Sequence, residues 1–363
     1  MMNLIITRNF PPDVGGMQNL MFGLTKSLSE HMMVKVFADE HYHQEKFDEE
    51  LSFSIERVGG PKIFRKFRKA SLINNYLQKN TKVKNIISDH WKSLENIDTK
   101  IRKTCLIHSK EINHKKDTFL NKRVVKVLNN CDHVIANSTF TKNLGIEIGV
   151  NEEKIKVINP GVFPKEEVNP KIEEKVLKKL EGKEPRLITV ARFDKRKNHE
   201  KIIMSLRNLK EIYPNIIYIC IGQGDTLESQ KKLIKELKLE SNVIFLKDLS
   251  KDEKNCYLKN SNVFVMPSIS YKKSVEGFGI VYVEAAQYGV PSIGGKVGGA
   301  SDAIVNNETG LLCDGNNMDE IYQSLVEILQ NNKFKILGKN AEENAKKFLW
   351  SEILKKYLEI LKN

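Results

Sequence analysis

Short apolar segments alternate with amphipathic segments along the whole chain, and this alternation restricts the fold more than any other feature. The longest apolar runs, such as residues 216–221, have the length of a strand. Apolar residues of the first amphipathic segment recur with the period of a helix: Met17, Leu20, Met21, Leu24 and Leu28. Strands that alternate with helices are typical of βαβ units, so the sequence predicts an α/β protein with parallel sheets.

The alternation runs twice, which indicates two domains. In the first half we expect strands at 3–7, 33–38, 83–88, 104–108, 133–137 and 154–158. A polar stretch rich in Lys and Glu ends at residue 186, and strands are then expected at 187–191, 216–222, 242–246, 263–267 and 291–294. We therefore predict domains at 1–163 and 164–346, and a C-terminal helix within 347–363 that packs back toward the first domain. Ligands are expected where loops leave the carboxyl ends of the strands.

Composition excludes several classes of protein. Hydrophobic residues make up 40% and charged residues 29% of the 363, as in ordinary globular proteins. No apolar stretch approaches the roughly 18 residues of a membrane-spanning helix. The five cysteines contain no Cys-x-x-Cys pair, so neither a zinc site nor a redox motif is indicated. Reduced, buried thiols and the lack of a secretory signal lead us to expect a cytoplasmic protein.

The net charge of +13 implies attraction to polyanions such as phosphates, nucleic acid or an anionic membrane. The alternative is that scattered lysines only solvate the surface.

Three loops carry residues suited to binding a phosphate. Gly15-Gly16 precedes the first expected helix, where backbone N–H groups can approach an anion, although a tight turn would also need glycine. Arg192 and Lys197 lie between a strand and a helix and could clamp a diphosphate, unless they form only a solvated basic turn. Residues 222–224 form a Gly-x-Gly pair without the third glycine of a dinucleotide-binding fingerprint, which disfavours a nicotinamide or flavin enzyme.

The segment 274–286 holds two carboxylates, Glu276 and Glu284, eight residues apart. On one helix this spacing gives about 12 Å, which exceeds the ~5–9.5 Å between the paired carboxylates of glycoside hydrolases. The spacing therefore suits one ligand that is held at both ends. The alternative is a helix with one acidic residue at its N-terminus and one on its surface. The apolar residues between them imply a buried helix, in which Glu284 needs a partner.

These motifs together resemble the retaining glycosyltransferases of family 4, which have the two-domain GT-B architecture and a Glu-x7-Glu signature. Glu276 and Glu284 match the signature, and Arg192 and Lys197 match the spacing of the diphosphate clamp. Further similar segments span nearly the whole chain: Gly15-Gly16, 131–138, 157–162, 222–224, 298–299 and 310–312. The resemblance implies two Rossmann-like domains that face a central cleft, the first binding the acceptor and the second the nucleotide sugar.

The resemblance also implies roles for residues of the second domain. Glu284 would bind the ribose, and Glu276 would hold the donor sugar together with backbone amides of the same segment. Further donor contacts are expected from Leu249 near the base and from Gly277, Phe278, Gly279 and Ile280.

Arg192, Lys197 and the Gly15–Gly16 turn would bind the diphosphate and stabilise its charge as the bond to the sugar breaks. His108 matches the active-site histidine that faces the donor sugar. The leaving phosphate would accept the proton of the acceptor, so no protein nucleophile is implied. No Asp-x-Asp occurs in the sequence, and neither a metal nor another cofactor is expected.

The segment Lys62–Lys84 contains eight basic residues, no acidic residue and seven interleaved large apolar residues. Such a basic amphipathic helix is typical of a segment that binds anionic lipid, although an ordinary helix packed on the first domain is the alternative. Basic family members often glycosylate lipids. We therefore expect a peripheral enzyme on the inner face of the cytoplasmic membrane. It would transfer a sugar from a UDP-linked donor to a lipid such as diacylglycerol.

Three other functions remain open. The acceptor could be a saccharide in lipopolysaccharide, capsule or exopolysaccharide assembly. A nucleotide-sugar epimerase shares the architecture but needs no acceptor. The charge alone would suit a nucleic-acid-binding protein, but no motif of such proteins is present, so we expect no nucleic acid.

Overall fold

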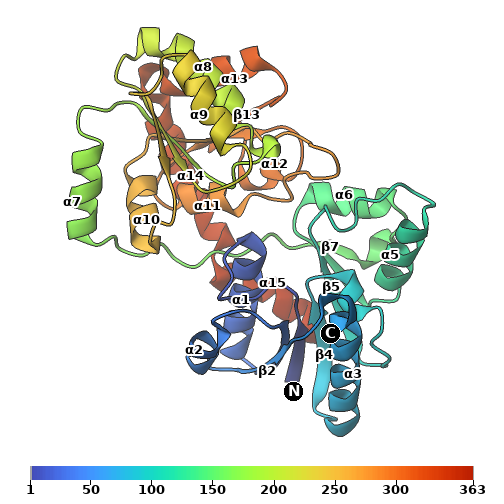
Figure 1. Cartoon of the computed structure of the whole chain (residues 1–363). Coiled ribbons are helices and arrows are strands. Elements are labelled where there is room, and N and C mark those ends of the chain that lie inside the picture. The colour runs from blue at the N-terminus through green and yellow to red at the C-terminus, as the bar shows by residue number, and fades with distance from the viewer. Residues whose placement is uncertain (1, 363) are drawn as a thin grey trace. The chain divides into compact units, whose positions relative to one another are not determined.

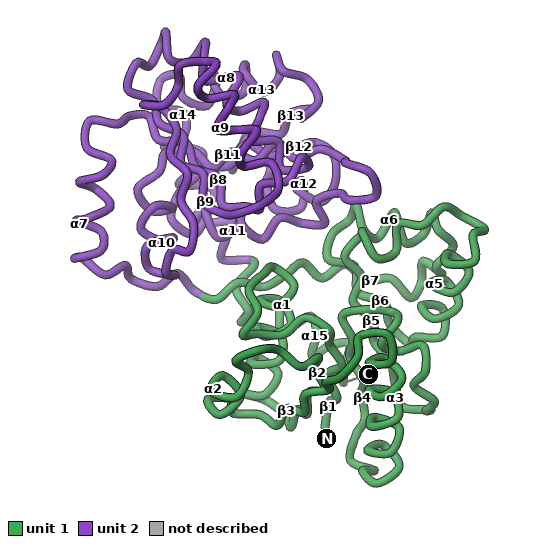
Figure 2. Tube along the Cα trace, in the orientation of Figure 1, with its two compact units in different colours: residues 1–163, 348–363 green, residues 164–347 purple. Residues whose placement is uncertain are grey.

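A computed structural model of the chain describes residues 2–362, which fold into two compact units (Figure 2). Unit 1 comprises Met1–Phe163 and Phe348–Asn363, and unit 2 comprises Pro164–Lys347. Each unit is built on one parallel sheet, as the alternation of the sequence predicts (Figure 1). The expected α/β class with two Rossmann-like domains is confirmed.

The sheet of unit 1 has seven strands in the order β3-β2-β1-β4-β5-β6-β7. The strands are β1 Met2–Ile6, β2 Met33–Asp39, β3 Ser54–Val58, β4 Val83–Ser88, β5 Arg102–Ile107, β6 His133–Ala136 and β7 Ile155–Val157. The helices are α1 Gly16–Ser29, α2 Gln44–Glu49, α3 Lys62–Lys79, α4 Trp91–Leu94, α5 Phe119–Asn129, α6 Thr139–Glu147 and α15 Trp350–Lys362.

Side chains that alternate along β1 enter two different cores in unit 1. Leu4 and Ile6 pack with apolar residues of α3, α4 and α5 on one face of the sheet. Ile5 points to the opposite face, where α1 and α15 pack. The helices therefore cover both faces, which explains why the central strands read as continuous apolar runs.

The sheet of unit 2 has six strands in the order β10-β9-β8-β11-β12-β13. They are β8 Arg186–Val190, β9 Ile217–Ile221, β10 Val243–Leu246, β11 Val263–Met266, β12 Ser292–Gly295 and β13 Gly310–Cys313. The helices are α7 Pro170–Lys179, α8 His199–Ile212, α9 Leu227–Glu236, α10 Lys251–Lys259, α11 Ile280–Ala286, α12 Ala300–Ala303, α13 Met318–Leu329 and α14 Lys333–Ala345.

The closing helix α15 belongs to unit 1, although unit 2 separates the two in sequence. The amide of Trp350 donates to the Val162 carbonyl at 2.9 Å. The Trp350 ring lies so close to Gly23 and Gly161 that a Cβ atom at either position would overlap it. Two glycines thus make room for this indole.

The pattern of apolar runs did not predict two of the strands, β3 and β13. Both lie at sheet edges and are short, and most of β3 is only half-buried or exposed, so it lacks a continuous apolar run. All five cysteines are free and buried, as expected.

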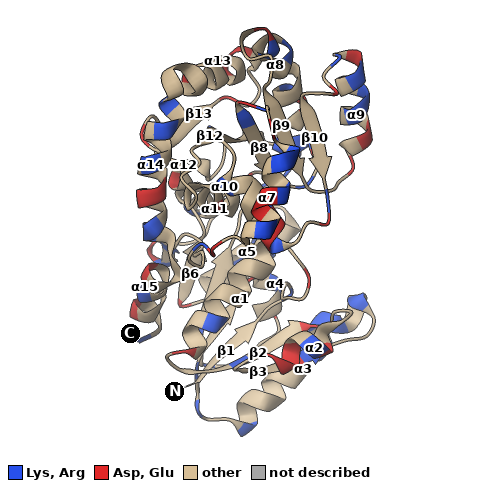
Figure 3. Ribbon diagram, turned by 90° about the vertical axis from the view of Figure 1, so that its left-hand side faces the viewer, with Lys and Arg blue, Asp and Glu red and all other residues tan. Residues whose placement is uncertain are grey.

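Acidic and basic residues are interspersed on outer helices such as α9 and α14 (Figure 3). Among residues 2–362, no helix combines the length and apolarity needed to cross a membrane.

Candidate functional site

The residues singled out in the C-terminal half gather at the carboxyl edge of the unit 2 sheet. Arg192 and Lys197 follow β8, residues 222–224 follow β9, Leu249 follows β10, and Glu276 lies in the loop after β11. Because β8, β9, β10 and β11 are parallel, their carboxyl ends share one edge of the sheet.

Glu276 is the centre of a buried ion cluster. Its Oε2 atom lies 2.5 Å from Lys197 Nζ and 2.6 Å from Arg196 Nη1. All three side chains are only 11–12% exposed. Burial opposes ionisation of Glu276, but the charges and hydrogen bonds of Lys197 and Arg196 outweigh it and hold the pKa of the carboxyl at about 2. Glu276 therefore stays ionised at neutral pH. Burial lowers the pKa of Lys197, and the charge of Glu276 opposes that effect.

A short turn between β8 and α8 positions both cations. The Asp194 side chain accepts a hydrogen bond from the Lys197 amide at 3.2 Å. Asn198 adopts the left-handed conformation with φ 64°, and its side-chain amide donates to the carbonyls of Pro267 and Gly315. Asn198 thereby ties the loop after β8 to the loops after β11 and β13.

The main chain of Glu276 is held by the glycine pair after β12. The amide of Gly299 donates to the Glu276 carbonyl at 2.8 Å. Gly298 has φ 99°, and a Cβ atom there would lie 2.5 Å from the same carbonyl oxygen. Glycine is therefore required at 298 both for the conformation and for the close approach.

The two carboxylates of the Glu-x7-Glu motif are not on one continuous helix, so the expected helical rise between them is wrong. The helix α11 begins at Ile280, and Glu276 lies in the loop before it. Gly279, with φ 85°, starts the helix and Phe278 beside it is buried. Glu284 has the partner that its half-buried position requires, because Lys254 Nζ lies 3.1 Å from its Oε2 atom.

Arg192 stands apart from this cluster. Its side chain is 80% exposed and makes a long ion pair of 3.8 Å with Asp194. Leu249, Gly277 and Ile280 are half-buried. The exposed guanidinium of Arg192 can approach an anionic ligand directly. Lys197 could bind such a ligand only if it weakened or broke its ion pair with Glu276.

Gly15 and Gly16 lie in unit 1, at the loop from β1 to the start of α1. Gly15 has extended backbone angles and supplies no side-chain cap, and the first N–H groups of a helix have no partner within the helix.

A second polar group lies at the carboxyl edge of unit 1, around His108. Asp89 follows β4, and its carboxylate accepts hydrogen bonds from the side chains of Thr7 and Asn9 at 2.8 and 3.2 Å. Burial raises the pKa of Asp89. Glu111 lies three residues after His108, and its Oε1 atom accepts from the His108 amide at 2.5 Å.

The His108 ring is buried at both nitrogens, and its polar neighbour is the backbone of Asp89. Burial lowers the pKa of His108 to about 4, so the imidazole is neutral at physiological pH. Burial raises the pKa of Glu111 to about 7. This edge therefore presents an uncharged imidazole that can donate one hydrogen bond and accept another.

The segment Lys62–Lys84 is not one free basic face. The helix α3 ends at Lys79, and Lys84 lies on β4. Four of its basic residues make internal ion pairs or hydrogen bonds: Arg65 and Lys69 with Asp39, Lys66 with Glu95, and Arg68 with the Gly59 carbonyl. Lys62, Lys79, Lys82 and Lys84 are exposed.

The sequence patterns did not single out three residues of these groups: Arg196, Asp89 and Glu111. Arg196 stands beside Lys197 in the basic turn, and only its contact with a residue 80 positions away distinguishes it. Asp89 directly follows an apolar strand, which is the same signal that selected His108. Within residues 2–362, no three His, Cys, Asp or Glu side chains are grouped in a way that could hold a metal ion.

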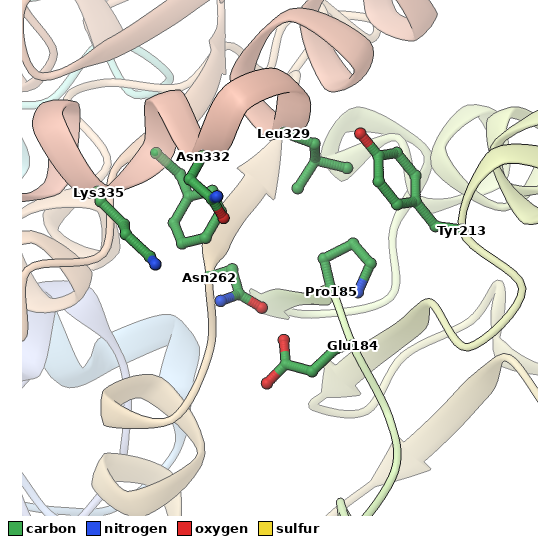
Figure 4. A pocket seen from close by; sticks show the side chains of 8 residues that line it. Glu184, Pro185, Tyr213, Asn262, Leu329, Asn332 and Lys335 are labelled. Carbon is green, nitrogen blue, oxygen red and sulfur yellow. The ribbon is translucent and has the colours of Figure 1, made fainter.

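A cavity of about 490 Å³ lies at the other edge of the unit 2 sheet (Figure 4). Glu184 and Pro185 precede β8 and Asn262 precedes β11, so they line the cavity from the amino ends of the strands. None of the residues singled out above lines it.

Known proteins match both halves of the chain. A family model described as "Glycosyltransferase Family 4" matches residues 14–166, and one described as "Glycosyl transferases group 1" matches residues 170–348. A GDP-mannose-dependent alpha-(1-6)-phosphatidylinositol monomannoside mannosyltransferase of Mycobacterium tuberculosis is 30% identical over 41% of this chain and 39% of its own. A trehalose synthase of Thermococcus litoralis is 29% identical over 60% of this chain and 55% of its own. The chain thus matches about two fifths to just over half of these relatives' lengths.

Solved structures resemble the chain over its full length. HepE of Anabaena, solved with UDP, has a TM-score of 0.84 at 18% identity and covers 100% of both chains. A sucrose-phosphate synthase of Thermosynechococcus elongatus has a TM-score of 0.80 at 20% identity, covering 100% of this chain and 98% of its own. At these identities the likeness concerns the fold.

Proposed function

We propose that this chain, which belongs to the GT-B glycosyltransferases, is a retaining enzyme that needs no metal. It transfers a sugar from a nucleotide diphosphate donor to a membrane lipid. The ion cluster of Glu276 with Arg196 and Lys197 is the observation that supports this proposal most. A carboxylate beside two cations can accept hydrogen bonds from sugar hydroxyls while the cations meet a diphosphate. Such an arrangement suits a ligand that is neutral at one end and anionic at the other.

In the proposed reaction the donor lies at the carboxyl edge of unit 2. Glu284 accepts from the ribose, Leu249 lies near the base, and the segment 277–280 offers backbone amides. Lys197 and the exposed Arg192 bind the diphosphate and stabilise the charge that develops as the glycosidic bond breaks. Arg196 then keeps Glu276 ionised when Lys197 turns to the phosphate.

The leaving phosphate accepts the proton of the acceptor hydroxyl on the face from which it departs, so the sugar keeps its anomeric configuration. In unit 1, the proposed contacts with the donor are His108 and the Gly15–Gly16 turn. The neutral imidazole of His108 donates a hydrogen bond to the donor sugar.

We propose a UDP-linked donor, since HepE holds UDP in its crystal, and GDP-mannose is the alternative that the mycobacterial relative suggests. A lipid acceptor agrees with that relative's phosphatidylinositol mannoside substrate and with the basic, apolar segment Lys62–Lys84. The proposed location is the cytoplasmic face of a membrane, at its surface.

The test is to incubate the purified protein with a panel of nucleotide sugars and candidate lipids and to identify products by mass spectrometry. Glu276→Ala and Arg192→Ala are expected to lose transfer, whereas Arg207→Ala, on an exposed part of α8, keeps it. Transfer only to saccharides refutes the lipid acceptor. Epimerised donor without any transfer refutes the transferase, and full activity in both site variants refutes the site.

A further inference from the structure

Four large apolar side chains are exposed at the carboxyl edge of unit 1. Ile63, Phe64 and Phe67 lie in the first turns of α3 and are 80%, 59% and 51% exposed. Phe119 is the first residue of α5 and is 77% exposed. Since α3 and α5 both begin where strands end in a parallel sheet, these side chains belong to one edge.

Contacts through Glu95 join the starts of α3 and α5 into one surface. The Lys66 Nζ atom lies 4.6 Å from the centre of the Phe67 ring and 3.6 Å from Glu95. The same carboxylate accepts from Arg123 at 2.7 Å, and the guanidinium of Arg123 lies 5.5 Å from the Phe119 ring. Helix α4, which ends next to Glu95, contacts both α3 and α5. The segments 62–67, 91–95 and 115–123 therefore form a continuous surface, called here the edge surface.

The edge surface is strongly basic. It holds eight Lys and Arg residues, whereas its acidic residues are only Glu95 and Asp117. Lys62, Lys115, Lys116 and Lys122 are exposed. Glu95 is already paired with two of the cations, so the charge presented to solvent is positive.

The exposed cations of α3 lie at opposite ends of the helix and do not form one patch. Lys62 lies at the carboxyl edge of the sheet, but Lys79 lies at the far end of an 18-residue helix, about 26 Å away. The other end of α3 has no exposed aromatic residue among those described. Within the segment Lys62–Lys84, basic and exposed aromatic side chains are combined only at the edge surface, which also includes a second element, α5, that the sequence did not suggest.

We propose that the edge surface docks on an anionic lipid bilayer, with Ile63, Phe64, Phe67 and Phe119 inserted among the acyl chains near the headgroups. The charge complementarity argues for this partner: lysines meet anionic headgroups, and the apolar tips between them gain from leaving water. The inference rests on the proposed lipid acceptor, because docking by this edge brings His108, which follows β5 at the same edge, toward the bilayer where that acceptor lies.

Co-sedimentation of the full chain with vesicles tests the proposal. The wild type is expected to bind vesicles of phosphatidylcholine with one third phosphatidylglycerol, and to bind pure phosphatidylcholine only weakly. Phe64→Ser and Phe119→Ser are each expected to weaken binding to anionic vesicles roughly tenfold. The matched control Ile336→Ser, at a 68% exposed position on α14 of unit 2, should bind as the wild type does.

A charge variant gives a second, independent measurement. Lys115→Glu with Lys116→Glu should weaken binding to anionic vesicles and leave the weak binding to neutral vesicles unchanged. Equal binding to both vesicle types, or unchanged binding by Phe119→Ser, overturns the proposal. So does binding of an oligonucleotide, but not of vesicles, that depends on the same side chains.

Hydrolysis of the nucleotide sugar in water separates the two proposals. Phe119→Ser should hydrolyse the donor at the wild-type rate, since the edge surface takes no part in holding it. If vesicle binding behaves as expected but no donor is turned over, the docking stands and the proposed function fails. If the donor is turned over but the vesicles are not bound, the docking fails alone.

Discussion

Replacing Glu111 with Gln is expected to remove a pH dependence from the stability of unit 1. The Glu111 carboxyl is buried, and its Oε1 atom accepts from the His108 amide. The Glu111 carbonyl accepts from the indole N–H of the fully buried Trp91 at 3.0 Å. Glutamine keeps the shape and the acceptor oxygen but cannot ionise, so the substitution isolates the charge.

The size and sign follow from the pKa of Glu111, which burial raises from 4.5 to about 7. Because the folded protein holds this proton more tightly than the unfolded chain, the stabilisation is complete below about pH 4.5. It is lost as the pH rises through about 7, where the folded protein ionises as well. The separation of the two pKa values corresponds to about 3 kcal/mol in the free energy of unfolding.

The assay is urea unfolding followed by tryptophan fluorescence at several pH values between about 4 and 8. Both tryptophans of the chain, Trp91 and Trp350, lie in unit 1, so the signal reports this unit alone. Relative to the wild type, Glu111→Gln should gain about 3 kcal/mol between the lowest and the highest pH. The charge of the neighbouring Asp89 also raises the pKa of Glu111, so the difference between the two proteins includes the interaction of these carboxyls.

The exposed Glu147→Gln, at the end of α6, is the control and should follow the wild type at every pH. If the profiles of the wild type and Glu111→Gln stay parallel, the carboxyl does not change its affinity for a proton on folding. The explanation from burial would then be wrong.

Three substitutions and one chelation experiment test other parts of the molecule. Arg192→Ala should lower kcat/KM for the nucleotide sugar at least roughly tenfold and leave the urea midpoint of unit 2 unchanged, because this exposed side chain makes only a weak ion pair. Arg196→Met should lower transfer and cost roughly 2 kcal/mol of stability, since it removes a charged hydrogen bond to the buried Glu276; unchanged unfolding of unit 2, followed by circular dichroism, would contradict the role of the cluster. Gly23→Ala should displace the Trp350 ring, shift its fluorescence to the red and cost about 1–3 kcal/mol. Transfer should continue at the same rate in EDTA, and a loss that added Mg²⁺ restores would refute metal independence.

Much of the fold could be predicted because it depends on local patterns. Buried parallel strands are apolar along their whole length, and the helices between them repeat with a helical period, so the class and the central strands follow from the order of residues. The edge strands β3 and β13 could not be found in this way. Ser54–Val58 is mostly half-buried or exposed and lacks an apolar run. Gly310–Cys313 is largely buried but only four residues long, too short to show a pattern.

Residues of the candidate site could be selected by type and by position after a strand, and the resemblance to a family supplied their suggested roles. Neither source could reveal which side chains pair. Arg196 and Lys197 are chemically similar neighbours of Asp194 in sequence, yet both turn to Glu276, which lies in the loop after another strand.

The sequence by itself determined the alternation of strands and helices, and with it the edge of each sheet where polar loops gather. Only the tertiary structure decided the burial of the Glu111 carboxyl, the ion cluster around Glu276 and the contacts of Lys66 and Arg123 with Glu95, which link Phe67 to Phe119. The physical reason is distance along the chain: periodicity acts between neighbouring residues, whereas pairing and burial depend on loops that a parallel sheet brings together from far apart.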